Sequence, residues 1–155
     1  MVNQITMKRY TQILIVVLIT FISSCGGGGE SGTIYFDVEK TKKWKETVSN
    51  ADGTTTTTIY YENGEKRKEE SFLGNRLHGK YMKWYKTGNL EAENSYNDGY
   101  KEGKHISYYS NGKVSSERNY KQGFLEGASK HFLVDGAVWL EESYTKGELA
   151  SFKRY

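Results

Sequence analysis

The sequence has no proline and only one cysteine, Cys25. One cysteine cannot form a disulfide within the chain, so a fold held together by internal disulfides is excluded. Hydrophobic residues are scarce, at 36% of 155 residues, yet 14% are aromatic and 13 are tyrosine. This aromatic content is too high for a disordered chain. The length leaves room for one folded domain.

A strong excess of positive charge is also missing. The formal net charge is +3, from 22 basic and 19 acidic residues. Lys8 and Arg9 lie within the first 24 residues, which contain no acid, so without that segment 20 basic residues face 19 acidic ones and the charge is +1. We expect no nucleic-acid partner, because such proteins present a basic face.

The first 25 residues have the pattern of an export signal. Two basic residues precede an apolar run over residues 13–22, which is too short to span a bilayer as a helix and has the length of a signal-peptide core. The run ends in the letters ISSC, which resemble the lipobox of bacterial lipoproteins, whose cysteine is acylated after cleavage. Residues 1–24 are then a signal peptide with a signal helix, and Cys25 is the lipid attachment site. The alternative is a lone cysteine beside an uncleaved anchor, or a buried thiol.

The lipobox predicts a protein anchored in the bacterial cell envelope, since several acyl chains hold a protein stably at a membrane. Gly26 follows the cysteine where an aspartate would retain the protein in the inner membrane, so the outer membrane is favoured if there are two. Residues 25–32 are the lipidated cysteine and a glycine-rich tether. Residues 33–58 are less regular, and we interpret them as an N-terminal cap or a degenerate repeat.

Glycines recur with a period of 24 residues over 59–155, which predicts four stacked repeats. A first glycine column holds Gly64, Gly88, Gly112 and Gly136. A second holds Gly74, Gly99, Gly123 and Gly147, displaced by one place in the first copy. Three places before the first glycine stand Tyr61, Tyr85 and Tyr109. Four places before it stand Tyr60, Trp84, Tyr108 and Phe132. Five places after it stand Glu69, Glu93, Glu117 and Glu141.

Each repeat is predicted to be a β-hairpin. The first glycine follows Asn, Thr or Asp, and Asn-Gly or Asp-Gly between strand-like runs favours a type I′ turn. In the second copy the strands are expected over 80–86 and 89–96. Together the hairpins predict an all-β fold, an elongated antiparallel sheet or open solenoid. Alternation along the second strand places Leu90, Ala92 and Tyr96 on an apolar and aromatic face, opposite an acidic and polar face that carries Glu93.

These columns resemble the variant MORN repeat, found in YwqK-type antitoxin proteins. The pattern is Tyr-Tyr-x-x-Gly, then Glu, then Tyr-x-x-Gly, then Gly-Lys, over roughly residues 59–147. The last copy departs from it, with Leu133 in place of a tyrosine, Ala128 in place of a lysine and Ser151 in place of a glycine. The resemblance implies a binding array, and an antitoxin or immunity role that blocks a toxin by contact.

No catalytic or metal-binding pattern stands out. Three histidines occupy three different places of the repeat, so we interpret them as solvated surface residues rather than metal ligands: His78, His105 and His131. The glutamate column gives every carboxylate the same surroundings, whereas an acid–base pair needs different ones, so we expect these residues to pair with Lys or Arg. A cation or ligand site is the alternative. We expect no cofactor and no catalysis.

The leading hypothesis is a membrane-anchored lipoprotein whose aromatic array binds or scaffolds another protein, because Tyr and Trp are favoured at interfaces. The family resemblance implies a toxin as that partner. The candidate interaction surface comprises Tyr61, Tyr85, Tyr109, Trp84, Glu93 and Glu117. The alternative is binding of phospholipid headgroups or polysaccharide by the aromatic face, and the near-neutral charge disfavours anionic headgroups.

Overall fold

The computed structural model of the chain describes residues 31–155. The predicted signal helix over 1–24, the lipid attachment site Cys25 and most of the tether lie outside the described residues. Within this range the fold is all-β, as predicted, and contains no helix. No segment there is a helix long and apolar enough to cross a membrane.

The described residues form one antiparallel sheet of 13 strands. They are β1 (Gly32–Tyr35), β2 (Lys43–Ser49), β3 (Thr55–Tyr60), β4 (Lys66–Leu73), β5 (Arg76–Trp84), β6 (Leu90–Asn97), β7 (Tyr100–Lys101), β8 (Gly103–Tyr108), β9 (Val114–Lys121), β10 (Phe124–Leu125), β11 (Gly127–Phe132), β12 (Val138–Thr145) and β13 (Glu148–Arg154). Strands follow one another across the sheet in chain order, apart from the short β7 and β10, which pair only with β6 and β9.

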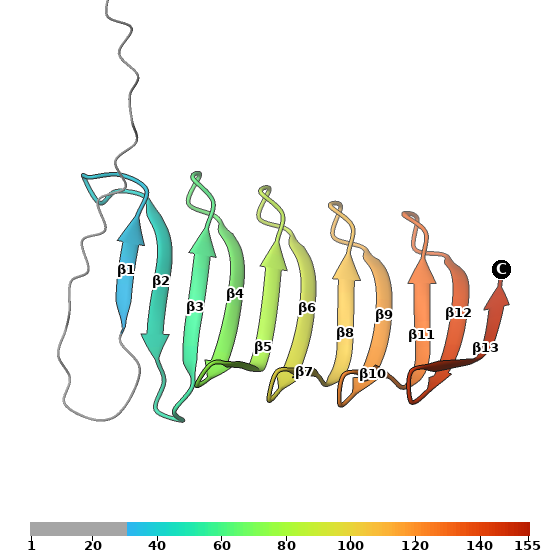
Figure 1. Cartoon of the computed structure of the whole chain (residues 1–155). Helices are drawn as coiled ribbons and strands as arrows, with labels where there is room; N and C mark the ends of the chain where they lie inside the picture. The colour runs from blue at the N-terminus through green and yellow to red at the C-terminus, as the bar shows by residue number, and fades with distance from the viewer. Residues whose placement is uncertain (1–30) are drawn as a thin grey trace, which may run out of the picture.

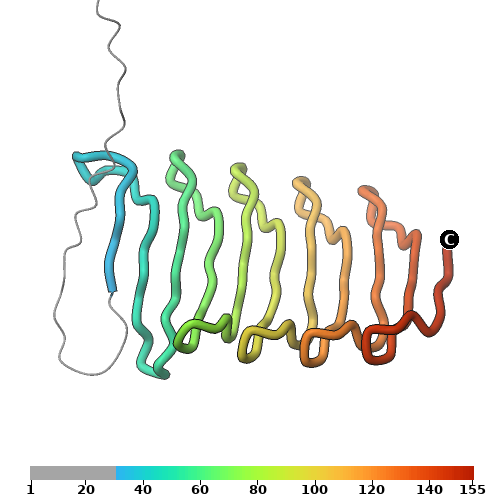
Figure 2. The backbone as a smooth tube through the Cα atoms, in the orientation of Figure 1, coloured from blue at the N-terminus to red at the C-terminus, as the bar shows by residue number. Residues whose placement is uncertain are grey.

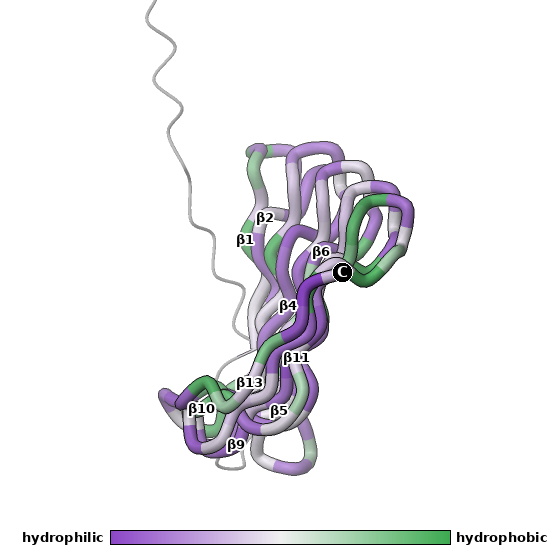
Figure 3. Tube along the Cα trace, turned by 90° about the vertical axis from the view of Figure 1, so that its right-hand side faces the viewer, coloured by the Kyte–Doolittle hydropathy of each residue, from purple (hydrophilic) through white to green (hydrophobic). Residues whose placement is uncertain are grey.

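The hairpins stand side by side as a single row (Figures 1 and 2). Seen from the end of the row, the strands lie one behind another in a single layer, and the turns at their two ends bend to opposite sides (Figure 3). The predicted elongated antiparallel sheet is therefore confirmed. The irregular segment that precedes the repeats contributes β1, β2 and most of β3 to the same sheet.

A single layer leaves the sheet without a hydrophobic core. No hydrophobic residue of the described range is buried, and its five buried residues are all polar: Thr57, Thr58, His105, Ser116 and Ser129. A sheet normally buries one face against a second layer, and here each side chain has only its neighbours on the same face. Stability therefore comes from strand ladders and from contacts between adjacent repeats.

The first glycines form one row of turns, and the predicted type I′ geometry is wrong there. In the second copy Gly88 donates to the Tyr85 carbonyl over 2.9 Å, and the Tyr85 N–H donates to Asn89 over 2.8 Å. Only Gly88 has positive φ, at 88°, while Thr87 does not. This is a three-residue loop, a type I turn closed by a glycine bulge. We call the four equivalent loops the first-glycine turns.

Side chains explain why Asn and Asp keep negative φ in these loops. Asn111 Oδ1 accepts the N–H of Lys113 over 3.0 Å, and Asp135 Oδ1 accepts that of Ala137 over 2.9 Å. Such a contact, from a side chain to the backbone two residues on, stabilises a turn by itself. The residue is thereby held in the type I turn instead of the left-handed region that a type I′ turn requires.

The second glycines form the opposite row, and here the tight turns are type I′. Both central residues have positive φ in three copies: 50° and 86° at Asp98–Gly99, 51° and 86° at Gln122–Gly123, and 51° and 86° at Lys146–Gly147. In the first copy Gly74 alone lies in that region, with φ 59°. We call these four loops the second-glycine turns. The hairpin turn predicted for one end of each repeat thus occurs at the other.

Candidate interaction surface

One line of residues crosses the sheet in register and carries the glutamate column. In order across the strands it holds Glu46, Thr58, Glu69, Met82, Glu93, Ile106, Glu117, Lys130, Glu141 and Lys153. Every second member is a glutamate, and directly paired residues of adjacent strands project from the same face. We call this line the glutamate row and its side of the sheet the glutamate face.

The glutamate face is also aromatic, so the predicted separation of acidic and aromatic faces is wrong. The Tyr60 hydroxyl donates to Glu46 over 2.9 Å, and burial together with this hydrogen bond raises the pKa of Tyr60 to about 12. Burial also raises the pKa of Tyr108, and the nearby carboxylates of Glu93 and Glu117 raise it further. The aromatic column four places before the first glycine therefore stands beside the glutamates.

A bulge in each hairpin also changes the face presented by the start of its second strand. Lys83 pairs with Ala92 but Trp84 pairs with Leu90, so Glu91 is an extra residue on its strand. One extra residue reverses the alternation of faces beyond it. Leu90 therefore shares the face of Trp84 and Glu93, while Ala92 and Tyr96 remain on the other face.

Most glutamates of the row are paired with lysines, as predicted. Lys66 lies 2.6 Å from Glu69, Lys104 lies 2.9 Å from Glu117, and Lys130 lies 2.8 Å from Glu141. Lys43 pairs with Glu46 in the same way over 2.9 Å.

Glu93 differs from the other glutamates of the row. No ion pair involves it within residues 31–155. Its in-register neighbours on the two sides are Met82 and Ile106, which are apolar. The middle of the glutamate face thus presents an uncompensated carboxylate between two apolar side chains, with Trp84 and Tyr108 on the same face.

The tyrosines predicted for the interaction surface bind the neighbouring repeat instead. Tyr61, Tyr85 and Tyr109 each donate their hydroxyl to a backbone carbonyl 23 residues on. The acceptors are Trp84, Tyr108 and Phe132, at 2.9, 2.8 and 2.6 Å. Of the six residues predicted for the surface, Trp84, Glu93 and Glu117 lie together on one face. The other three, the tyrosines, use their hydroxyls for hydrogen bonds to the next repeat.

The opposite face carries a stack of rings. Tyr81, Tyr96, His105 and Tyr120 follow one another with centroid distances of 5.9, 5.6 and 4.6 Å. His105 is only 6% exposed and its Nε2 lies 2.8 Å from the Ser95 carbonyl. The interpretation of His105 as a solvated residue is wrong. It stands 24 residues after Tyr81, so the repeat period was the signal that could have placed it in the ring column.

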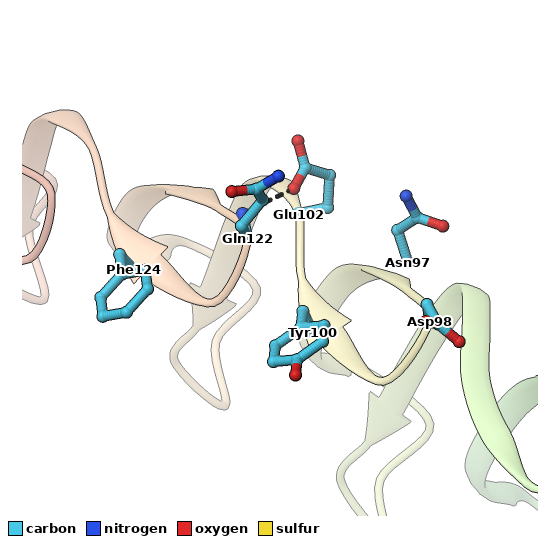
Figure 4. A pocket seen from close by; sticks show the side chains of 6 residues that line it. All are labelled: Asn97, Asp98, Tyr100, Glu102, Gln122 and Phe124. Atoms are coloured by element: carbon cyan, nitrogen blue, oxygen red, sulfur yellow. Dashed lines mark hydrogen bonds between the residues drawn. The ribbon is translucent and has the colours of Figure 1, made fainter.

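A third feature, absent from the sequence predictions, lies along the second-glycine turns. It is an open hollow of about 450 Å³ lined by Asn97, Asp98, Tyr100, Glu102, Gln122 and Phe124 (Figure 4). Tyr100 and Phe124 are each 60% exposed, and their rings point to the same side of the ribbon. They stand one period apart, and Arg76 holds the same place in the preceding copy.

These features define a repeat protein with an open single-layer sheet and two accessible faces. The family model described as the MORN repeat variant matches residues 77–98 and 101–122. Residues 77–122 thus contain two copies of the MORN repeat variant, which confirms the resemblance of the glycine and tyrosine columns to this repeat.

Other comparisons add little to the family match. A search of curated proteins found no match. Among solved structures the chain is similar to part of the "Crystal Structure of TarM", with 11% identity and a TM-score of 0.35. That similarity covers 74% of this chain and 20% of that one, so the chain spans about a fifth of the solved protein. In residues 31–155 no three His, Cys, Asp or Glu side chains gather as metal ligands.

Proposed function

We propose that this protein is a bacterial lipoprotein whose MORN array binds another protein at the cell envelope, and that the middle of the glutamate face is the contact. The observation that supports this most directly is the free carboxylate of Glu93 between Met82 and Ile106. Trp84 and Tyr108 share that face and supply the large aromatic area that dominates binding energy at interfaces.

The chemistry of this patch suggests a matching partner surface. Lysines neutralise Glu69 and Glu117, the next glutamates on each side, which leaves Glu93 as the carboxylate available to a partner. A Lys or Arg of the partner, flanked by apolar side chains, would pair with Glu93 and cover Met82 and Ile106. Electrostatic complementarity of this kind sets the choice of partner more than the total affinity.

Two narrower elements remain proposals. The lipobox at Cys25 supports a lipid anchor in the envelope. The glycine-rich tether would then let the folded repeats stand clear of the membrane. The resemblance to YwqK-type antitoxins supports a toxin as the partner. Neither element is needed for the glutamate face to bind protein.

Affinity capture tests the contact. Full-length protein is used to capture partners from detergent-solubilised bacterial envelope, in strains with and without the candidate toxin. We expect a specific partner that is lost with Glu93→Lys and with Trp84→Ala. Glu62→Lys, which makes the same charge change in an exposed turn, and Trp44→Ala, outside the aromatic column, serve as matched controls. Recovery of the same proteins by Glu93→Lys as by the wild type would refute the proposed contact.

The anchor has its own test, independent of any partner. Intact mass and membrane fractionation compare the wild type with Cys25→Ala in a bacterial host. We expect acyl chains and membrane association only in the wild type. A soluble, unmodified wild-type protein would leave the binding face in place but remove the envelope from the proposal.

A further inference from the structure

The exposed rings along the second-glycine turns each pack against a glycine of the next repeat. A Cβ added at Gly123 would lie 3.3 Å from Tyr100 Cδ1, and one added at Gly147 would lie 3.2 Å from Phe124 Cδ1. Each ring therefore lies against the glycine backbone of the following turn, while the residue as a whole remains 60% exposed. This contact restricts the rotamers of the ring and so reduces the side-chain freedom that is lost when a flat ligand binds.

Both carboxylates of the hollow accept hydrogen bonds within the protein, but only Asp98 has a charged partner. Both Asp98 oxygens lie 2.7 Å from Nη1 of Arg76. Glu102 accepts the backbone N–H of Gln122 over 2.8 Å, as Figure 4 shows. Two carboxylates disfavour an anionic ligand, and the Arg76 contact reduces the attraction for a cation.

The neutral polar groups remain available. Within residues 31–155, the side-chain amides of Asn97 and Gln122 have no hydrogen-bond partner, and both residues are exposed. A primary amide both donates and accepts, which suits hydroxyl groups. The hollow therefore combines exposed aromatic faces with free amides, and Glu102 is its one carboxylate without an ion pair.

We propose that this hollow binds a neutral polysaccharide. Its sugar rings would stack on Tyr100 and Phe124, and its hydroxyls would bond the amides of Asn97 and Gln122. Equivalent residues of adjacent repeats lie two strands apart, ~10 Å at the usual strand spacing, a distance comparable to the reach of a disaccharide. The site lies along the turns, away from the glutamate face, so it is independent of the protein contact proposed above.

Retardation in native gels that contain a soluble polysaccharide tests this site with the full-length chain in detergent. The neutral probes are hydroxyethylcellulose, galactomannan and pullulan, and alginate is the anionic probe. We expect at least one neutral probe to slow the wild type. Phe124→Ala should weaken the apparent affinity about tenfold or more, as for truncation of an aromatic anchor, and Tyr100→Ala should act similarly.

Controls separate binding from folding and from the glutamate face. Tyr100→Phe keeps the ring and should bind like the wild type. Phe152→Ala removes a ring that is 62% exposed outside the hollow and should also bind normally, as should Glu93→Lys. Asn97→Ala tests the amide without disturbing a packed ring and should weaken retardation. The proposal is overturned if no neutral probe retards the protein, if only alginate does, or if folded Phe124→Ala binds like the wild type.

Discussion

The two rows of turns join neighbouring repeats in different ways. At the first-glycine turns the link is a side chain, since Tyr85 donates its hydroxyl to the Tyr108 carbonyl of the next repeat. At the second-glycine turns it is the backbone, since Gly123 donates its N–H to the Lys101 carbonyl of the preceding repeat over 2.9 Å. The same task is thus performed by a hydroxyl at one end of the strands and by the main chain at the other.

The last repeat shows what this difference means for sequence variation. Leu133 replaces the linking tyrosine, yet its loop keeps both backbone hydrogen bonds, at 2.8 Å each. The first-glycine turn therefore forms without the hydroxyl. Both rows keep glycine in all four copies, always with positive φ. Only in the second row do two of these glycines, Gly123 and Gly147, also meet an aromatic ring. We expect the second row to tolerate fewer substitutions.

A pair of glycine substitutions in one repeat tests this expectation most directly. Gly112 and Gly123 have nearly equal φ, 84° and 86°, but only Gly123 faces a ring where a Cβ would go. Gly112→Ala should cost about 1 to 2 kcal/mol for the left-handed backbone. Gly123→Ala should cost a further ~1 kcal/mol or more for overpacking against Tyr100. Urea denaturation of both variants measures the difference, and equal losses would remove the distinction between the rows.

Removal of one linking hydroxyl tests the first row. Tyr85→Phe deletes the bond to the Tyr108 carbonyl and should lower the free energy of unfolding by about 1 kcal/mol. Tyr100→Phe is the matched control, because the Tyr100 hydroxyl forms no hydrogen bond within residues 31–155. We expect this variant to be as stable as the wild type. If the two variants are equally stable, the phenolic link does not hold the repeats together.

His105 lies between the two rows, and its burial predicts a pH dependence. Burial lowers the pKa of His105 below its ordinary value of 6.5, against the opposing effect of its bond to Ser95. As pH falls below 6.5, the unfolded chain takes up a proton that the folded chain resists, so the free energy of unfolding decreases. The slope from this one group is at most about 1.4 kcal/mol per pH unit.

Replacement of this histidine isolates its contribution. His105→Tyr introduces tyrosine, the residue that the preceding repeat has at the equivalent position, Tyr81. The free energy of unfolding of this variant should decrease less steeply as the pH falls below 6.5. Chemical denaturation at several pH values provides the measurement. A slope unchanged by the substitution would mean that other groups cause it.

The smallest effect is expected for the ion pair at the second-glycine turns. Arg76 and Asp98 are 67% and 61% exposed, and pairs so open to solvent contribute little to stability. Arg76→Ala should leave the denaturation midpoint within experimental error, in contrast to Gly123→Ala. A clear loss would show that this side chain supports its row, as Tyr100 and Phe124 support the following ones.

The repeat period predicted much of the fold, because glycine and aromatic residues mark the hairpins directly. Strands expected over 80–86 and 89–96 are close to β5 and β6, which span Arg76–Trp84 and Leu90–Asn97. The turn type was missed at the first glycines, where the Asn and Asp side chains favour a different loop than the Asn-Gly pattern predicts. The hairpin bulge was also missed, since nothing about Glu91 alone marks it as an extra residue.

The candidate surface was predicted in part for the same reason. A column shows which residues are equivalent, and it correctly grouped the glutamates with one another. It does not show which columns lie on the same face of the sheet, because a bulge changes the face of the residues beyond it. It also treats Glu93 like Glu117, whereas the difference between them depends on whether a lysine completes an ion pair. Contacts across strands decide this, and the order of residues within one repeat does not contain them.

The order of strands in the sheet also has a kinetic consequence. Each strand hydrogen-bonds only to strands next to it along the chain, with β7 and β10 as short additions to the same ladders. All pairings are therefore close in sequence, and the contact order is low for an all-β protein. Because folding rates rise as contact order falls, this chain should fold faster than a β-sandwich of similar length. Its sheet can grow one strand at a time in the order of synthesis, without waiting for a distant segment.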